Sequence, residues 1–289
     1  MTDPSARLSV VIPAHNEADV IGDIVRRVRT VVPEAEIIVV DDGSPDQTAE
    51  RAAEAGALVL RNPYNIGNGA SVRRGIRAST GDVVVMMDGD GQHPPEMIPT
   101  LLTPLQQYDM IVGARTGKSE TSSIRNIGNR MLIWVAQWLS GRTIPDLTSG
   151  FRVVKREPLF EYLHLFPSRY SYPTTITLAM MLAGRFVHYV PVDGISRRRS
   201  GRSDLSPIAD FLRFVAIMFR VIMLFNPRRI FIPLSALVFL ASVFVGTFQF
   251  LRTGGIHSAG LALFLSSMFI ACFGLLADQI ALLRRERRD

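Results

Sequence analysis

Cysteine and lysine are nearly absent from this chain of 289 residues. The single cysteine, Cys272, excludes an intrachain disulfide and any metal site built from several thiolates. Lysine occurs only at positions 118 and 155, so nearly all of the positive charge behind the net +6 comes from arginine. No nucleic-acid partner is expected, because no DNA- or RNA-binding motif and no interleaving of basic with aromatic residues accompanies this bias. The N-terminus also lacks the basic flank and long apolar core of a secretory signal, which predicts a cytoplasmic N-terminal domain.

The apolar residues, 47% of the chain, are distributed unevenly. Residues 1–205 have the composition of an ordinary globular α/β domain, whereas residues 206–283 are overwhelmingly apolar. We therefore predict three parts. They are a catalytic domain at 1–205, an amphipathic helix lying in the membrane interface at 206–227, and a transmembrane hairpin at 228–289.

Two long apolar runs support the hairpin. Residues 230–251 form an uncharged run of 22 residues, long enough to cross a bilayer, and a second span covers about 259–279. Arginines precede the first span and follow the second, while the connecting loop carries only Arg252. The positive-inside rule then predicts an inner-membrane protein with both ends and the catalytic domain in the cytoplasm. A hairpin buried in a protein core is the alternative, which these lengths and flanks disfavour.

Polar side chains follow several predicted strands. Apolar runs of strand length alternate with helical patterns, which predicts a doubly wound, mostly parallel α/β sheet covered on both faces. Ligands bind such sheets beyond the carboxyl ends of the strands. Four strand exits carry polar clusters, at residues 15–17, 41–46, 88–93 and 115. We expect them to form one site.

Asp88 and Asp90 directly follow the apolar run at residues 83–87. Two carboxylates at this spacing suit Mg²⁺ or Mn²⁺ shared with a diphosphate. A lone D-x-D is more often a solvated turn, so its neighbours decide its meaning.

Several segments together resemble one family. They are VVIPAHNE at residues 10–17, VVDDGSPDQT at 39–48, DGDGQHPPE at 88–96, TSGFR at 148–152 and RRSGRS at 198–203. They are similar to family 2 glycosyltransferases of the GT-A fold, and most to the dolichyl- or polyprenyl-phosphate hexosyltransferases of the two-span bacterial branch. The chain departs from that pattern at residues 89 and 91, where glycines replace the usual alanine and leucine.

The resemblance implies a site for a nucleoside diphosphate sugar, UDP-glucose or GDP-mannose. Its nucleotide-sugar contacts would be Pro13, His15, Glu17, Asp42 and Asp88. The metal ligands would be Asp88, Asp90 and Gln92, holding Mg²⁺ or Mn²⁺. For Asp42 the alternative is turn formation.

The resemblance also implies a polyprenyl phosphate acceptor and an inverting transfer. The catalytic residues would be Asp90, Asp146, Arg115 and Arg130, and the acceptor phosphate would meet Arg198, Arg202 and Ser203. Arginine suits this task because it binds phosphate through two parallel hydrogen bonds. Arg125 competes with Arg130 for its role, Asp146 could instead cap a helix, and the arginines near 198 could contact anionic lipid.

Other functions remain open at this point. The fold could serve as a non-catalytic nucleotide-binding membrane scaffold, or the enzyme could use a different lipid or polysaccharide acceptor. A processive synthase is disfavoured because its Q-x-x-R-W motif is absent. The sequence names neither the sugar nor the oligomeric state, and a homo-oligomer is allowed.

Overall fold

The computed structural model describes residues 6–115, 123–168, 172–192, 207–255 and 258–286; among these, the side chains at 123–130, 139, 207–213, 253 and 284–286 are not described. The strands are β1 (Leu8–Ala14), β2 (Glu36–Asp41), β3 (Leu58–Arg61), β4 (Val83–Met86), β5 (Met110–Arg115), β6 (Arg152–Lys155) and β7 (Val187–Val192). The helices are α1 (Ile21–Val31), α2 (Thr48–Glu54), α3 (Asn68–Ala78), α4 (Ile98–Leu102), α5 (Ser123–Ser140), α6 (Arg156–Tyr162), α7 (Tyr172–Leu182), α8 (Pro207–Phe225), α9 (Arg228–Thr253) and α10 (Ser258–Glu286).

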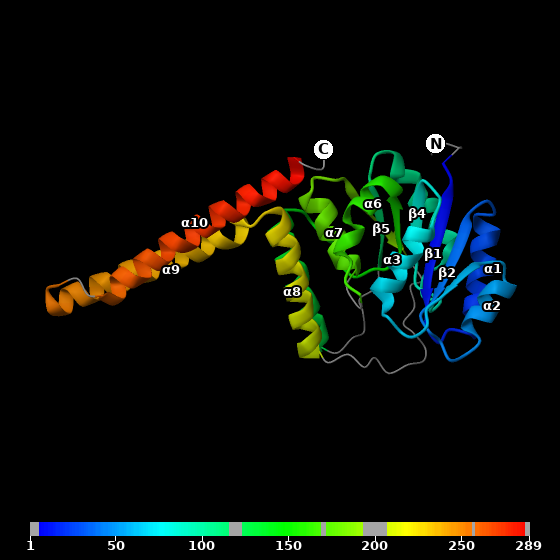
Figure 1. Ribbon diagram of the computed structural model, residues 1–289, viewed down its shortest axis with the longest axis horizontal. Coiled ribbons are helices and arrows are strands. Elements are labelled where there is room, and N and C mark those ends of the chain that lie inside the picture. The colour runs from blue at the N-terminus through cyan, green and yellow to red at the C-terminus, as the bar shows by residue number, and fades with distance from the viewer. Residues whose placement is uncertain (1–5, 116–122, 169–171, 193–206, 256–257, 287–289) are drawn as a thin grey trace. The chain divides into compact units, whose positions relative to one another are not determined.

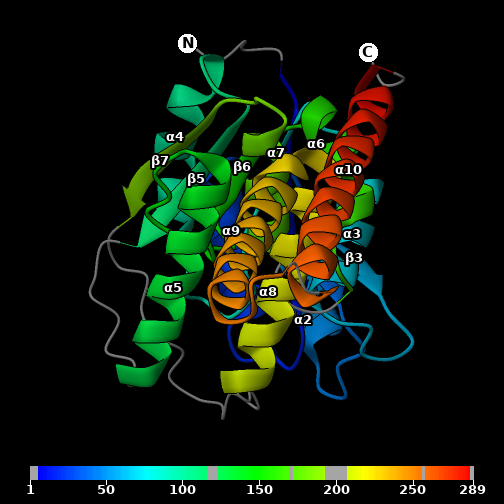
Figure 2. The ribbon, with the colours of Figure 1, turned by 90° about the vertical axis from the view of Figure 1, so that its left-hand side faces the viewer.

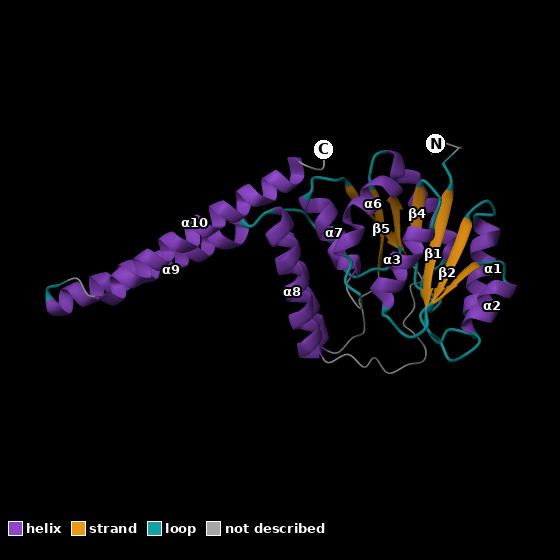
Figure 3. Cartoon of the chain, in the orientation of Figure 1, coloured by secondary structure: helices purple, strands orange, loops and turns teal. Residues whose placement is uncertain are grey.

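Within the described residues the strands form one seven-stranded sheet in the order β3-β2-β1-β4-β6-β5-β7 (Figure 3). All neighbouring pairs are parallel except those of β6, which runs antiparallel to both β4 and β5. The predicted mostly parallel α/β sheet is therefore confirmed, while β6 and β7 are additions to the predicted strands. Because β6 runs in the opposite direction, it begins at the edge of the sheet where β4 and β5 end.

Different helices cover the two faces of the sheet. On one face, Ile24 of α1 and Leu101 of α4 share a buried cluster with Val10 of β1. The next strand residue, Val11, points to the opposite face because side chains alternate along a strand. There Gly75 of α3 lies so close that a Cβ on it would overlap Val11. Burial of both faces explains the nearly continuous apolar runs of these strands.

Helices α9 and α10 lie side by side (Figures 1 and 2). The Gly260 backbone approaches that of Gly246, and Ser242 Oγ donates a hydrogen bond to the Gly260 carbonyl at 3.0 Å. By length and composition, two helices of the described chain could cross a membrane, at Arg228–Arg252 and Ser258–Leu283. These helices agree with the predicted transmembrane hairpin.

The chain divides into two compact units, Met1–Met218 and Phe219–Asp289. This division falls inside α8, whereas the sequence places boundaries near 205 and 227, and the three-part division stays a prediction. In the second unit, Asp278 Oδ1 lies 3.0 Å from Arg228 Nε. This ion pair gives Asp278 a structural partner near one end of the hairpin.

Candidate functional site

The loops that follow β1 and β2 are fastened to each other. The Asn16 amide donates to Ser44 Oγ at 3.0 Å, and the Glu17 amide donates to Thr48 Oγ1 at 2.9 Å. These bonds fix the backbone beside His15, whose Nδ1 is buried without a hydrogen-bond partner in the described structure. A buried polar atom without a partner is rare in a protein at rest. A contact between His15 and a nucleoside stays a prediction.

Asp42 is occupied by the loop between β3 and α3. Its Oδ1 accepts hydrogen bonds from Asn62 Nδ2 at 2.8 Å and from the Ile66 amide at 2.9 Å, and its Oδ2 accepts one from the Gly67 amide at 2.9 Å. The residue is 3% exposed. This geometry supports the alternative role in loop formation, and a contact between Asp42 and a nucleobase stays a prediction.

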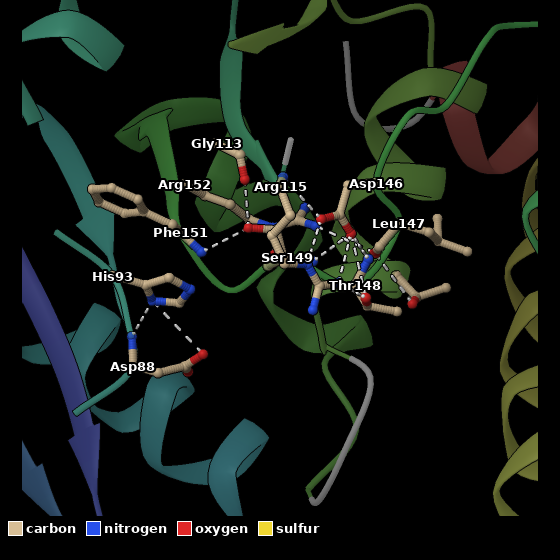
Figure 4. Close-up of polar contacts among 11 residues, drawn as sticks. Asp88, His93, Gly113, Arg115, Asp146, Leu147, Thr148, Ser149, Phe151 and Arg152 are labelled. Carbon is tan, nitrogen blue, oxygen red and sulfur yellow. Dashed lines mark hydrogen bonds and ion pairs between the residues drawn. The ribbon is translucent and has the colours of Figure 1, made fainter. Parts of the chain in front are cut away.

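Asp88 follows β4, and its carboxylate accepts no hydrogen bond from the described residues. Its amide donates to His93 Nδ1 at 3.0 Å, and the His93 ring stacks on Phe151 with centroids 5.2 Å apart. Because Nδ1 accepts this bond, the neutral imidazole carries its proton on Nε2. The distance of 3.8 Å between Nδ1 and Asp88 Oδ2 is too long for a hydrogen bond. His93 thus fixes the backbone and leaves the carboxylate available (Figure 4).

The two glycines of the 88–93 segment have separate causes. The Gly89 amide donates to the Pro13 carbonyl at 3.2 Å, and a Cβ at position 89 would lie 2.9 Å from that oxygen. Gly91 has a φ of 75°, a backbone conformation that residues with a Cβ rarely adopt. It allows the chain to turn, and the Gln92 amide then donates to Asp90 Oδ1 at 3.1 Å. The backbone at positions 89 and 91, next to the proposed metal ligands, therefore favours glycine over residues with a Cβ.

The segment 146–150 leads into the antiparallel β6, which lies between β4 and β5 in the sheet. Asp146, Leu147, Thr148 and Ser149 of this segment are labelled in Figure 4. At one end, Gly150 faces Asp88: a Cβ on Gly150 would lie 2.5 Å from Asp88 Oδ2. At the other end, Asp146 contacts Arg115. The reversed strand thus brings together two parts of the site that parallel strands alone would leave apart.

Arg115 and Asp146 form an ion pair through two hydrogen bonds. Arg115 Nε donates to Asp146 Oδ2 at 2.8 Å, and Nη2 donates to Oδ1 at 3.0 Å. The Thr148 and Ser149 amides donate to the same carboxylate at 3.0 and 3.1 Å. Burial acts to raise the pKa of Asp146, but the side-chain hydrogen bonds and charge of Arg115, with the Thr148 and Arg115 amides, outweigh it and lower the pKa below its ordinary value. The hydrogen bond with Asp146 raises the pKa of Arg115.

Asp146 therefore holds Arg115 in place as a permanent cation. The Arg115 side chain remains 44% exposed, and the nearby Asp88 carboxylate also acts to raise its pKa. This geometry is compatible with a role for both residues near an anionic substrate. A direct catalytic role for either residue stays a prediction.

Arg152 anchors the segment 146–150 through buried hydrogen bonds. Its side chain is fully buried, Nε donates to the Ser149 carbonyl at 2.8 Å, and Nη1 donates to Thr177 Oγ1 at 2.6 Å. Burial lowers the pKa of Arg152. The motif at residues 148–152 contains this arginine, but only the structure shows that it anchors the segment.

The described residues contain no group of three or more His, Cys, Asp or Glu side chains placed to hold a metal. A resident site made only of such side chains is therefore not found in this part of the chain. A shared site fits better, since Mg²⁺ is usually held by one or two carboxylates together with substrate phosphates. The unsatisfied Asp88 carboxylate and the space left by Gly150 are consistent with such a site. Asp88, Asp90 and Gln92 would be its protein ligands.

Several predicted residues fall outside the description. Arg198, Arg202 and Ser203 lie outside the described residues, and for Arg130 only the backbone of α5 is described. Conversely, the prediction overlooked His93 and Gly150 as individual site residues. Both stand inside motifs noted in the sequence, but only their tertiary contacts with Asp88 distinguish them from their neighbours.

Comparison with known proteins decides the family. The family model described as Glycosyl transferase family 2 matches residues 9–163, more than half of the chain. The chain belongs to this family. A second model, described as the GtrB C-terminal hairpin, matches residues 226–283. The predicted glycosyltransferase class is thus confirmed at the level of the family.

Two relatives are polyprenyl-phosphate enzymes. The chain is 31% identical over 225 residues to a dolichol-phosphate mannosyltransferase of Pyrococcus furiosus, and the match covers 72% of this chain and 62% of that protein. It is 29% identical over 214 residues to an undecaprenyl-phosphate mannosyltransferase of Micrococcus luteus, covering 69% of this chain and 88% of that protein. The match thus spans less than two thirds of the length of the Pyrococcus protein. The resemblance to this type of family 2 enzyme is confirmed.

Among solved structures, the chain resembles glucosyl-3-phosphoglycerate synthase from Mycobacterium tuberculosis, in complex with Mn²⁺, uridine diphosphate and phosphoglyceric acid. The TM-score is 0.61 at 23% identity, and the match covers 75% of this chain and 78% of that one. At this identity the likeness supports the fold alone. The predicted GT-A fold is confirmed.

Proposed function

We propose that this family 2 protein transfers a hexose from a nucleoside diphosphate sugar to a polyprenyl phosphate at the cytoplasmic face of a membrane, with inversion at the anomeric carbon. The observation that carries the proposal is Asp88, a carboxylate at the end of a central strand that receives no hydrogen bond from the residues the structure describes. Support comes from two mannosyltransferase relatives that use polyprenyl phosphates, and from the neighbour solved with Mn²⁺ and a uridine nucleotide.

Divalent metal dependence follows from the carboxylate pair. Asp88, Asp90 and Gln92 would hold Mg²⁺ or Mn²⁺, which when bound would neutralise the diphosphate leaving group. Pro13, His15 and Glu17 belong to the loop that would line the nucleoside.

The phosphate of the acceptor lipid requires cations close to it more than it requires a general base. The second pKa of a phosphate monoester is about 6, so the acceptor is already an anion near neutral pH. One of its oxygens bonds to the anomeric carbon while the bond from that carbon to the diphosphate breaks, and the nucleoside diphosphate leaves. Two anions must therefore lie close together. Among the described residues, Arg115, which pairs with Asp146, is the cation we propose for this role. We also propose Arg130, Arg198, Arg202 and Ser203.

The test uses the purified full chain in detergent with undecaprenyl phosphate, Mn²⁺ and a panel of labelled UDP- and GDP-hexoses. We expect a lipid-linked product from at least one donor, and its loss on chelation of the metal. Asp90→Ala should weaken nucleotide binding in the presence of Mn²⁺, whereas Asp19→Ala, at an exposed position, should not.

Two results would count against the proposal. The first is a wild-type protein that makes no lipid-linked product, together with an Asp90→Ala variant that binds nucleotide as well as wild type. Such a protein is better described as a membrane scaffold. Full activity of Arg198→Ala would remove that residue from the acceptor site.

A further inference from the structure

Next to Asp88 lies a pocket of about 160 Å³. Its lining includes Asn68 at the start of α3, Thr148 and Gly150 before β6, and Tyr172 at the start of α7. Typical sites for drug-sized ligands have ~300–1,000 Å³. This pocket is therefore too small for a whole nucleotide sugar and has the scale of a single sugar ring.

The chemistry of the lining favours a neutral ligand. Asp88 is its one charged side chain, and no arginine or lysine is among the described residues that line it. Arg115 reaches only as far as the Thr148 hydroxyl, to which its Nη2 donates at 2.5 Å. Among these lining residues a phosphate would meet only a carboxylate, and its charge would have to be compensated by the metal ion proposed at Asp88. A hexose suits the mixed wall better, since Tyr172 and Pro173 offer apolar surface and the other side chains offer polar atoms.

Asn68 is the unsatisfied member of this wall. Its Oδ1 is buried and has no hydrogen-bond partner among the described residues. By contrast, Thr148 Oγ1 accepts from Arg115, and Thr174 Oγ1 donates to the Leu147 carbonyl at 3.4 Å. An unpaired buried carbonyl oxygen is costly unless a ligand supplies a donor. Asn68 lines the pocket, and the last torsion of asparagine is broad, which allows its amide group to reorient toward a ligand.

We propose that this pocket receives the transferred hexose, and that Asn68 Oδ1 accepts a hydrogen bond from one of its hydroxyl groups. Asn68 is then a residue that determines sugar specificity, in the same pocket wall as Asp88. This assignment rests on the proposed function and adds to it the pocket in which the sugar is recognised.

The experiment compares full-length wild type and Asn68→Ala, using UDP-glucose and GDP-mannose and the monodeoxy analogues of each hexose. In wild type, removal of the recognised hydroxyl should lower kcat/KM. In Asn68→Ala, the penalty for that one hydroxyl should disappear while the others persist, and kcat/KM for the complete sugar should fall by about 5–20-fold. Asn68→Asp keeps an acceptor oxygen and should keep the penalty. Asn65→Ala, an exposed asparagine of the same loop, should keep the whole pattern.

Binding of UDP and GDP alone separates this role from a structural one. We expect Asn68→Ala to change it by less than about twofold, since only the sugar contact is lost. An equal loss of nucleotide and nucleotide-sugar binding, or retention of every deoxy penalty in Asn68→Ala, would overturn the assignment while leaving the transferase intact. If wild type uses neither donor nor any other nucleoside diphosphate hexose, the proposed function itself fails.

Discussion

Asp42 and Asp88 stand at the ends of β2 and β4, two strands separated only by β1, yet their surroundings are opposite. Asp42 is 3% exposed and accepts three hydrogen bonds from the loop before α3. The Asp88 side chain is 33% exposed and accepts none from the described residues. Carboxylates saturated by backbone donors stabilise a fold, whereas an unsatisfied one is available for a ligand. The difference indicates that Asp42 stabilises the loops around the site, whereas Asp88 is available to bind a ligand.

The same substitution at the two positions tests this difference most directly. Asp88→Asn should reduce transfer by about 10²–10³-fold, because a neutral amide binds a divalent ion poorly. The apparent Tm should stay within about 2 °C of wild type, since none of the described residues donates a hydrogen bond to this carboxylate. Initial rates at saturating donor and a thermal melt measure the two quantities. A large drop in Tm would show that Asp88 is also structural.

Asp42→Asn should show the reverse pattern. The new NH₂ group would face amide donors, and a buried amide left without an acceptor costs about 1–3 kcal/mol. We expect unfolding to become easier by about 2–4 kcal/mol, which lowers Tm by about 5–15 °C in a domain of this size. Asp19→Asn, at an exposed position on the neighbouring loop, is the control and should change little. An unchanged Tm with weakened nucleotide binding would instead support a direct contact with the base.

Gly150→Ala sharpens the comparison without touching either carboxylate. The added Cβ would lie 2.5 Å from Asp88 Oδ2, so the carboxylate must move. A displacement of about 1 Å at a reacting centre can cost up to ~10²-fold in rate, and we expect a loss of about 10–100-fold in kcat/KM. The metal concentration needed for half-maximal activity should rise as well. Gly255→Ala, which has open space around it, is the control. Wild-type kinetics in Gly150→Ala would show that the position of the Asp88 carboxylate is not critical.

Hydropathy and motif spacing predict much of this molecule. The hairpin follows from two long uncharged runs, and the exits of β1, β2, β4 and β5 follow from short apolar runs that end in polar residues. These features are local, so the chain itself carries the signal. The position of Asp88 at the end of a buried strand is one of them.

What escaped prediction depends on tertiary contacts. β6 has only four residues, two of them charged, and its reversed direction has no local signature. That direction places Gly150 against Asp88 and Asp146 against Arg115. Likewise, aspartate is common both in turns and in ligand sites, so Asp42 could be interpreted only once the amides of Ile66 and Gly67 were seen to bind it.

The smallest predicted effect concerns Asp146, a third carboxylate at this edge and one that lies between the two extremes. Burial acts to raise its pKa, but the hydrogen bonds from Arg115 and the backbone amides lower it below the ordinary value. A lowered pKa in the folded state stabilises the protein above the unfolded pKa of about 4, and this stabilisation is lost as the pH falls through the folded value. As the pH falls below about 4, Asp146→Asn should therefore lose less stability than wild type.

At pH 7 the Asp146→Asn variant should already be less stable by about 1–2 kcal/mol, because the charged hydrogen bonds with a partly exposed Arg115 are gone. Thermal melts of both proteins across this pH range measure the effect, and Asp19→Asn again provides the control. If the Tm of wild type and that of Asp146→Asn fall equally with decreasing pH, the partners of Asp146 do not stabilise its ionised form in the fold. Arg115 would then lack the fixed carboxylate that holds its guanidinium in place.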